Sequence, residues 1–513
     1  MQSGIAAVGG MRRIWTRPLA RALRGIIAAR IAPVLPDSRG TIATTLLTGG
    51  GSAIPEADRA AFRDSGLAHL LAIAGLHIGT VMGLSFAFSR FFLALSERAA
   101  LHLLIKQIAA VTALVAGGAY MLLIGAHVPI IRSFSMACVV TLGVLVGRRA
   151  LSLRGLALAM AVLILMAPSE VLGVRFQMSF SAVLALIAGY DALRPALAQL
   201  YGDGSWWRRC LSHLVALAPT SALAGIFSAP FGAYHFGHVQ LYFVLANMAA
   251  VPLTALWVMP AGLISLGLMP LHLEALALVP MGWGIGTILW IGRTVSAWPS
   301  AVMAVPHRSA WGLGVLSLGI AWLRLWRSRL RLAGLAAILL GLVSPALERP
   351  PDLLVSADAR LIALHADAGM FLQKGSGASR VTLEAWQQLW AADGTLPFPV
   401  TGGSGGGAIT CTEAACTLRA HGEVAMLLRG AGTRDDCAGG LLISARPIRL
   451  SCPADVATID RFSVWRDGAE AVWLDAAGSH ILSDRQFRGE RPRVPHAPGL
   501  GRMAPGLTPA LSE

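Results

Sequence analysis

The stretch from Ala68 to Gly79, which reads AHLLAIAGLHIG, places His77 within an apolar run. A charged residue at mid-membrane costs about 2.5–3.5 kcal/mol, and a neutral imidazole, which costs less, still needs a partner, a cavity or water. Gly75 and Gly79 flank the histidine and predict the close approach of another helix, because they carry no side-chain bulk. His77 is therefore interpreted either as a residue that lines a hydrated path or bonds to another helix, or as a packing histidine satisfied by a backbone carbonyl.

Four further polar side chains fall within later apolar runs: Arg132, Gln177, Ser179 and Asn247. A buried Arg132 needs a counter-charge or a polyanion, and a phosphate suits the guanidinium fork; the alternative is that it snorkels to the nearby helix end. The three uncharged groups either hydrogen-bond neighbouring helices together or line a wet cavity. No nucleophile–base pair accompanies them, so we predict no catalytic residues.

Pro252 and Pro260 lie in one apolar run and predict a kink or break that frees backbone carbonyls. Transporters use broken helices at their binding sites, although proline is also frequent in membrane helices generally. His235 and His238 (HFGH) are assigned to an outer loop, where an isolated HxxH pair is weak support for a metal site. We expect neither a metal nor another cofactor.

Four of the six cysteines cluster near the C-terminus: Cys411, Cys416, Cys437 and Cys452. Their spacing lacks the CxxC pairs that zinc prefers. Four cysteines in a small exported domain predict disulfides instead, and three pairings are possible.

Composition identifies the chain as a polytopic membrane protein. It has 513 residues, of which 55% are hydrophobic and only 13% charged, with a mean hydropathy of +0.64. A soluble domain carries about 25% charged residues. The net charge of +15 is compatible with a nucleic-acid binder, but arginines on cytoplasmic loops under the positive-inside rule are the simpler cause.

Hydrophobic segments of roughly the 20 residues that a span requires predict a bundle of about ten transmembrane helices. They lie near 67–89, 101–124, 129–147, 152–168, 176–193, 211–229, 240–267, 273–297, 310–323 and 332–347. Alternate loops are rich in arginine, which assigns them to the cytoplasm and places everything after Leu347 outside it.

The segments outside the bundle differ in composition. Residues 1–44 predict a basic amphipathic helix and a linker, and 45–347 the membrane domain. Strand-like alternation and one helical run predict a small α+β domain over 348–488, with a flexible loop at Gly402–Gly407. A Pro/Gly-rich tail over 489–513 is expected to be disordered.

The membrane region resembles the ComEC family of competence proteins, the inner-membrane proteins proposed to pass transforming DNA into the cytoplasm. The resemblance rests on four stretches in order: GLAHLLAIAGLHIG (66–79), VPIIRSFSMA (128–137), FQMSFSAVLAL (176–186) and YHFGHVQLYFVLANMAAVPLTALWVMPAGL (234–263). The resemblance implies that the chain forms a channel for single-stranded DNA and is surrounded by membrane lipids. It also implies a periplasmic DNA-binding protein and a cytoplasmic motor or helicase as partners on other chains, and a homo-oligomer as one state of the channel. No GxxxxGK[ST] motif appears in the chain itself.

The chain departs from the family pattern at both ends. Members usually begin with further spans and an OB-like domain, so we interpret this chain as a shortened member or a truncated gene model. Many members end in a β-lactamase-like nuclease domain whose metal motif reads HxHxDH. The nearest match in this chain, His365-Ala366-Asp367, lacks the other ligands of that motif. We therefore expect the C-terminal domain of this chain to be a degenerate form of the nuclease domain. The alternatives are a membrane-embedded metal-dependent hydrolase or nuclease, and a decayed remnant that no longer transports.

Overall fold

The computed structural model describes residues 20–489, except 51–52, 72–74, 126–127, 147–152, 167, 201–205, 306–308, 327, 393, 431–436, 438–439, 450–451, 454–455 and 477. Most of the predicted basic helix before residue 20 and the predicted tail after Gly489 therefore lie outside the description. Internal contacts divide the chain into two units, Met1–Met303 and Ala304–Glu513. The sequence had placed its boundary later, after residue 347.

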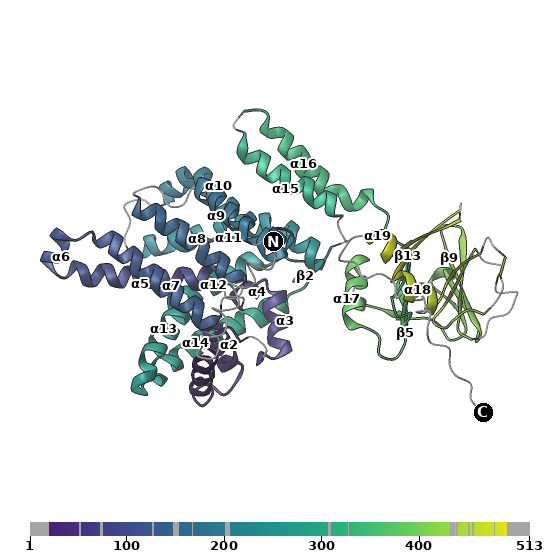
Figure 1. Cartoon of the computed structure of the whole chain (residues 1–513), viewed down its shortest axis with the longest axis horizontal. Helices are drawn as coiled ribbons and strands as arrows, with labels where there is room; N and C mark the ends of the chain where they lie inside the picture. The colour runs from purple at the N-terminus through teal and green to yellow at the C-terminus, as the bar shows by residue number, and fades with distance from the viewer. Residues whose placement is uncertain are drawn as a thin grey trace, which may run out of the picture. The chain divides into compact units, whose positions relative to one another are not determined.

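The first unit is built from helices, coloured purple to teal in Figure 1. A helix over residues 20–31 comes first. The α-helices that follow are α2 (Ser38–Thr48), α3 (Glu56–Asp64), α4 (Ala68–Leu71), α5 (Gly75–Ala94), α6 (Glu97–His102), α7 (Ile105–Ile124), α8 (Val128–Leu145), α9 (Leu153–Met166), α10 (Val174–Leu200), α11 (Trp206–Phe236), α12 (Phe243–Leu253), α13 (Met259–Leu268) and α14 (Ala275–Ser296). Two short strands, β1 (His238–Gln240) and β2 (Val302–Ala304), pair with each other.

Four helices in the described residues are long and apolar enough to cross a membrane. They are α5, α7, α14 and the continuous helix Phe243–Leu271. Five shorter apolar helices cover 133–145, 153–165, 174–187, 310–323 and 331–347. The structure thus agrees with a membrane protein, while the number of ten spans stays a prediction.

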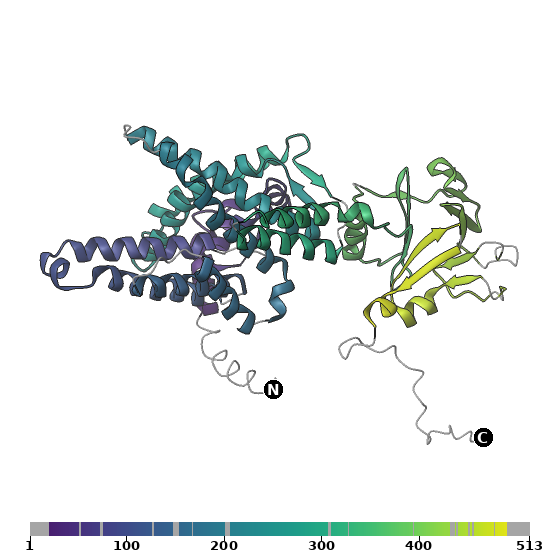
Figure 2. The same cartoon turned by 90° about the horizontal axis from the view of Figure 1, so that it is seen from above.

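The first predicted span begins later than expected. We expected one helix from residue 67, whereas α4 is a separate four-residue helix and α5 starts at Gly75. Helices α5 and α7 then run side by side, joined through α6 (Figures 1 and 2). The start of α5 at Gly75 places His77 in the first turn of the long helix.

The main core of this unit lies where α2, α3, α12 and α14 meet. Helix α2 begins after Asp37, whose carboxylate accepts a hydrogen bond from the Arg39 N–H, and ends at Gly49, which has a φ of 84° that glycine adopts without strain. The apolar face between these caps contributes Ile42, Leu46 and Leu47 to the core. The Gly-, Ser- and Thr-rich segment from Asp37 to Ala53 predicts a linker and a short helix; α2 is that helix, and it belongs to the packed interior.

The second unit begins with a pair of helices, α15 (Ala310–Leu325) and α16 (Arg331–Val343). They lie side by side (Figure 1) and touch through glycines. A Cβ built on Gly319 would lie 2.7 Å from the Gly334 carbonyl oxygen, and one on Gly341 would lie 2.6 Å from that of Gly312. Glycine is required at these contacts because the backbones themselves are in contact.

The rest of the second unit is a sandwich of two six-stranded sheets. One sheet has the order β14-β13-β3-β4-β5-β6 and the other β12-β11-β10-β9-β8-β7. The strands are β3 (Leu353–Val355), β4 (Leu361–Ala366), β5 (Gly369–Lys374), β6 (Leu396–Pro397), β7 (Gly402–Ser404), β8 (Ile409–Cys411), β9 (Ala415–Ala420), β10 (Glu423–Leu428), β11 (Leu441–Ser444), β12 (Ala457–Ile459), β13 (Glu470–Asp475) and β14 (Gly478–Ser483). Three helices accompany them: α17 (Arg380–Leu389), α18 (Arg461–Asp467) and α19 (Asp484–Arg488).

Alternation along the strands creates two apolar faces. Leu353, Phe371 and Leu427 belong to a core shared by both sheets, whereas Leu372 packs with Trp386 of α17 on the outer side of the first sheet. Residues Gly402–Gly407, which we predicted to be a flexible loop, form β7 and a 3₁₀ turn instead. That prediction was wrong because Gly402 and Gly403 pair with β8, and Gly405–Gly407 form the turn that follows.

Two disulfides close this domain. Cys411 is joined to Cys416 across the β8–β9 pair, and Cys437 is joined to Cys452. This is one of the three pairings that the sequence left open.

Candidate functional site

His77 lies on the buried face of α5 and is fully shielded from solvent. Helix α5 packs against α7, α8, α13 and the turn Thr254–Val258, and its buried residues Ile78 and Val81 join a cluster with Tyr120 and Met259. Neither ring nitrogen of His77 has a hydrogen-bond partner in the described part of the chain. A buried polar group left unpaired costs about 1–3 kcal/mol, so this position carries a local cost to stability.

The two glycines beside His77 do not make the close contact that we predicted. A Cβ on Gly79 would meet nothing within 4 Å, and one on Gly75 would find its nearest neighbour, the Ser133 hydroxyl, at 3.9 Å. The reason is geometric: residues four apart share one face of a helix, and this face of α5 is exposed while His77 lies on another. Close approaches occur elsewhere, for example at Gly117, whose Cβ would lie 2.8 Å from Met82 Cγ.

The helix that contains both predicted prolines is continuous but irregular. Helix α12 ends at Leu253, one residue after Pro252, and α13 begins at Met259, one residue before Pro260. Between them the residues Thr254–Val258 form a π-helical turn. The prolines therefore flank a local change from α-helical to π-helical hydrogen bonding, and the helix is not broken there. Such π turns occur frequently at functional sites.

Asn247 of α12 has a buried side-chain oxygen without a hydrogen-bond partner in the described residues. It precedes the π-helical turn by two helical turns on the same continuous helix. Because α5 packs against both the π-helical turn and α13, the structure brings the GLH stretch and the proline-flanked helix together. Sequence spacing could not show this proximity.

Gln177 belongs to a different contact. Its side-chain oxygen lies 3.0 Å from Nε2 of His235, which joins α10 to α11. We had assigned His235 to an outer loop, and that was wrong, because it lies in the last turn of α11. Of the two roles considered for Gln177, the structure shows hydrogen bonding between helices.

The remaining predicted residues contribute less. Ser179 is half-buried on α10. Arg132 lies in α8, but its side chain is outside the description, so the choice between burial and snorkelling stays open.

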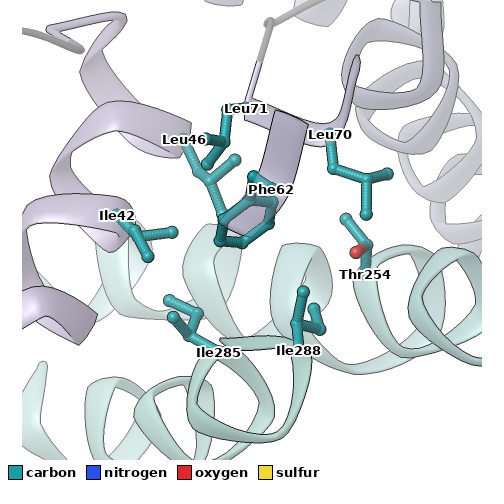
Figure 3. Close-up of a pocket in the computed structure, with 8 residues that line it drawn as sticks. All are labelled: Ile42, Leu46, Phe62, Leu70, Leu71, Thr254, Ile285 and Ile288. Carbon is teal, nitrogen blue, oxygen red and sulfur yellow. The ribbon is translucent and has the colours of Figure 1, made fainter. Parts of the chain in front are cut away.

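An apolar cavity lies beside the π-helical turn (Figure 3). Side chains from five elements point into it: Ile42, Leu46, Phe62, Leu70, Leu71, Thr254, Ile285 and Ile288. The Thr254 hydroxyl is not free, since it donates a 2.7 Å hydrogen bond to the Ala250 carbonyl. With a volume of about 10 Å³, the cavity holds one water at most and is a packing defect of the core.

Sequence reasoning missed several long-range polar contacts, three of which involve α14, α7 and the N-terminal segments. Arg30 pairs with Glu274 at 2.6 Å, just before α14, and Asp58 of α3 pairs with Arg293 at 2.5 Å, near the end of α14. Tyr120 donates a 2.9 Å hydrogen bond to the Leu46 carbonyl of α2. These contacts tie the N-terminal segments to both ends of α14 and to α7. Each of these polar residues is visible in the sequence, but its partner lies more than seventy residues away along the chain.

The histidines of the sandwich are engaged in structural contacts. The His365 ring stacks on Trp390 with centroids 5.3 Å apart, and burial lowers the pKa of His365 below its usual range. His421 lies 3.4 Å from Asp352, whose carboxylate also accepts hydrogen bonds from Arg349 and the Leu474 N–H. No group of three His, Cys, Asp or Glu side chains that could hold a metal ion occurs in the residues searched, which are those that the structure describes.

Comparisons with known proteins place the helical region in a family. A family model described as "Competence protein" matches residues 46–330, more than half of the chain and all four motif stretches. The "ComE operon protein 3" of Bacillus subtilis (strain 168) is 27% identical over 262 residues, which cover 51% of this chain and 30% of that relative. The match therefore spans less than a third of the relative's length, and no solved structure matches. The chain belongs to the competence protein family, the one that its motifs resemble.

Proposed function

We propose that this chain forms the membrane path by which single-stranded DNA enters the cytoplasm during natural competence. Membership of the competence protein family and the likeness to a ComE operon protein support a role in DNA uptake. Four helices of membrane-spanning length supply a bundle in which such a path can run. A motor and a DNA-binding protein on other chains would deliver and pull the strand.

The observation that carries this proposal is the unpartnered His77. A side chain that is fully buried, with both nitrogens free of protein partners in the described residues, is costly unless water or a ligand reaches it. Asn247 Oδ1, on a helix that α5 contacts, is unpartnered in the same way. Polar groups kept without protein partners are what a transiently hydrated path requires.

Passage of a strand requires the helices to move apart. The cavity beside the π-helical turn holds only about 10 Å³, far less than a nucleotide needs. The π-helical turn supplies a place for such movement, because its i→i+5 hydrogen bonds can convert to the α-helical pattern. We propose that α12 and α13 move relative to α5 at this turn and expose His77 to the strand.

The proposed orientation places the strand domain outside the cytoplasm of a bacterial inner membrane. Its two disulfides support this placement, because such bonds persist in oxidising compartments. The distribution of arginine among the loops supports the same orientation.

The test is a deletion strain complemented with the wild-type chain or with His77 variants, in which fluorescent DNA is followed and transformants are counted. We expect the deletion to leave DNA outside the cytoplasm and to yield no transformants. His77→Phe, which keeps an apolar ring, should be inserted at normal levels but fail to restore transformation. Normal transformation by the deletion strain would overturn the DNA path.

Gly79→Ala is the matched control, because it changes the same helix at a position where an added Cβ meets nothing within 4 Å. It should transform like the wild-type chain. Rescue by His77→Phe would show that His77 only packs, and would leave the membrane topology as the surviving part of the proposal.

A further inference from the structure

A polar cavity in the strand domain lies at the end of the two sheets where β4 begins and β5 ends. It has a volume of about 170 Å³. Sites for drug-sized ligands occupy about 300–1,000 Å³, whereas one water takes about 30 Å³, so this cavity suits a small ion or group. Its lining combines both sheets: Asp358, Ala359, Arg360, Gln373, Lys374, Gly375, Ala445 and Arg461.

The charge of this lining is strongly positive. Arg360, Lys374 and Arg461 face a single carboxylate, that of Asp358. Asp358 is already occupied, because its Oδ1 accepts hydrogen bonds from the Ser356 hydroxyl at 2.6 Å and from the Arg360 N–H at 3.1 Å. Although burial raises the pKa of Asp358, these hydrogen bonds lower it below its usual range, so the carboxylate stays ionised. The Asp358 carboxylate therefore interacts with groups of its own turn.

The cations are less engaged. Arg360 donates from Nη1 to the Gly377 carbonyl at 3.2 Å, and its Nε lies 3.9 Å from Asp358 Oδ2, so Nη2 keeps its donors. The side chains of Lys374 and Arg461 have no ion pair or hydrogen bond within the described residues. Three cationic groups in the lining of one small cavity outnumber its single carboxylate, which pairs with Arg360, and this excess of positive charge predicts an anionic occupant.

A second feature restricts which anion fits. The side-chain oxygen of Gln373 is buried and has no hydrogen-bond donor in the described part of the chain. Gln373 is two residues from Phe371 on β5, so it shares the face that enters the core between the sheets. An acceptor in that position is satisfied by a donor N–H or O–H group, and an anion in the cavity supplies one if it is protonated.

The backbone at this cavity is also unusual. Ala359 is buried and has a φ of 55°, in the left-handed region that non-glycine residues rarely adopt. The turn Ser356–Arg360 holds it there through the hydrogen bonds to Asp358. Strained backbone that its surroundings enforce is concentrated at functional sites.

We infer that this cavity binds a phosphate monoanion that retains a hydroxyl, either free phosphate or the phosphate of a monoester. The three cations take the charged oxygens and Gln373 Oε1 accepts from the P–OH group. Sulfate and phosphodiesters carry no such hydrogen at neutral pH, so the site discriminates against them. The inference is independent of the DNA path proposed above, and it needs no metal.

The test uses the full chain in nanodiscs at pH 6 with EDTA present, and follows binding by the broadening of ³¹P resonances. We expect the ³¹P resonances of inorganic phosphate and of methyl phosphate to broaden when the chain is present. Sulfate should not displace either phosphate from the cavity. Binding of methyl phosphate assigns the site to monoesters, and binding of inorganic phosphate alone assigns it to the free ion. Equal binding of dimethyl phosphate, or no binding of either phosphate in the presence of EDTA, would overturn the inference.

Variants locate the site. Lys374→Gln and Arg461→Gln each remove one charge-assisted contact and should weaken phosphate binding by about tenfold. Gln373→Met should retain anion binding but lose the preference for phosphate over sulfate. Arg380→Gln is the matched control, since Arg380 is 88% exposed on α17 and lies outside the cavity. If Arg380→Gln weakens binding as much as Lys374→Gln, the charge of the domain surface and not this cavity attracts the ion.

Discussion

The helices up to Ser296 and the strands from Leu353 onwards satisfy their polar groups in different ways. In the sandwich, the buried Asp352 accepts hydrogen bonds from Arg349 and the Leu474 N–H and has His421 beside it. In the helices, His77 and the side-chain oxygen of Asn247 are buried without partners in the described residues. The helical region therefore bears this cost at two uncharged groups, whereas the sandwich pairs its buried Asp352 carboxylate but leaves the side-chain oxygen of Gln373 without a partner in the described residues. Both unpaired groups lie on helices of membrane-spanning length, which is why we place the path there.

The two regions are also held together differently. The helices rely on close contacts at glycines and on a few polar pairs between distant segments, as at Gly282 against Leu35 and Asp58 with Arg293. The sandwich combines strand ladders, a core shared by two sheets and two disulfides. Perturbations that act on one kind of contact should therefore leave the other region unaffected, and this can be tested.

The largest effect is expected from the disulfides. Replacing Cys437 and Cys452 by serine should destabilise the sandwich by about 3 kcal/mol, because the bond closes a loop of 15 residues. The pair Cys411–Cys416, with a separation of 5, should cost roughly 2 kcal/mol. Hydrogen exchange of strand peptides would measure both losses, and exchange in α5 and α14 is the internal control. Equal destabilisation of those helices would contradict the separation of the two regions.

A second effect is expected at the glycine contact of α15 and α16. Gly334→Leu should destabilise this helix pair by about 1–3 kcal/mol, since its Cβ would lie 2.8 Å from the Gly319 carbonyl oxygen. Limited proteolysis of the loop between the helices would detect their separation. Gly314→Leu, on α15 with nothing within 4 Å, is the matched control. If the control is equally sensitive to the protease, added bulk and not backbone contact is responsible.

A smaller effect is expected at the pair between α3 and α14. Arg293→Leu leaves the Asp58 carboxylate, whose side chain is 3% exposed, without its partner. The Arg293 side chain is itself 60% exposed, so we expect a cost near the lower end for a charged hydrogen bond, about 1.5 kcal/mol. The melting temperature in detergent should fall. Arg63→Leu, whose partner Asp64 is its chain neighbour, should lower the free energy of unfolding by less than about 0.5 kcal/mol and leave the melting temperature nearly unchanged.

The sequence predicted local features well and long-range ones poorly. Alternation predicts strands at Glu423–Arg429, Gly440–Ser444 and Ala469–Leu474, and β10, β11 and β13 match these bounds to within a residue, because the pattern of a half-buried strand lies within the strand itself. The GLH stretch marked a helix whose histidine is buried, but the outward direction of Gly75 and Gly79 depends on which neighbours α5 contacts. The pairs Arg30–Glu274 and Gln177–His235 join residues far apart in the chain, so no local pattern contains them.

A pH dependence confined to the sandwich is expected as well. Burial raises the pKa of Glu470, at the start of β13, to about 7. Between about pH 4.3, where an unfolded glutamate titrates, and pH 7, the folded domain binds more protons than the unfolded chain, so its stability falls as pH rises. Glu470→Gln should remove this fall and stabilise the strands at pH 8, whereas Glu384→Gln, an exposed carboxylate on α17, should not. Hydrogen exchange at pH 5 and pH 8 compares them. A slope that persisted unchanged in the Glu470→Gln variant would mean that Glu470 is not the source of the pH dependence.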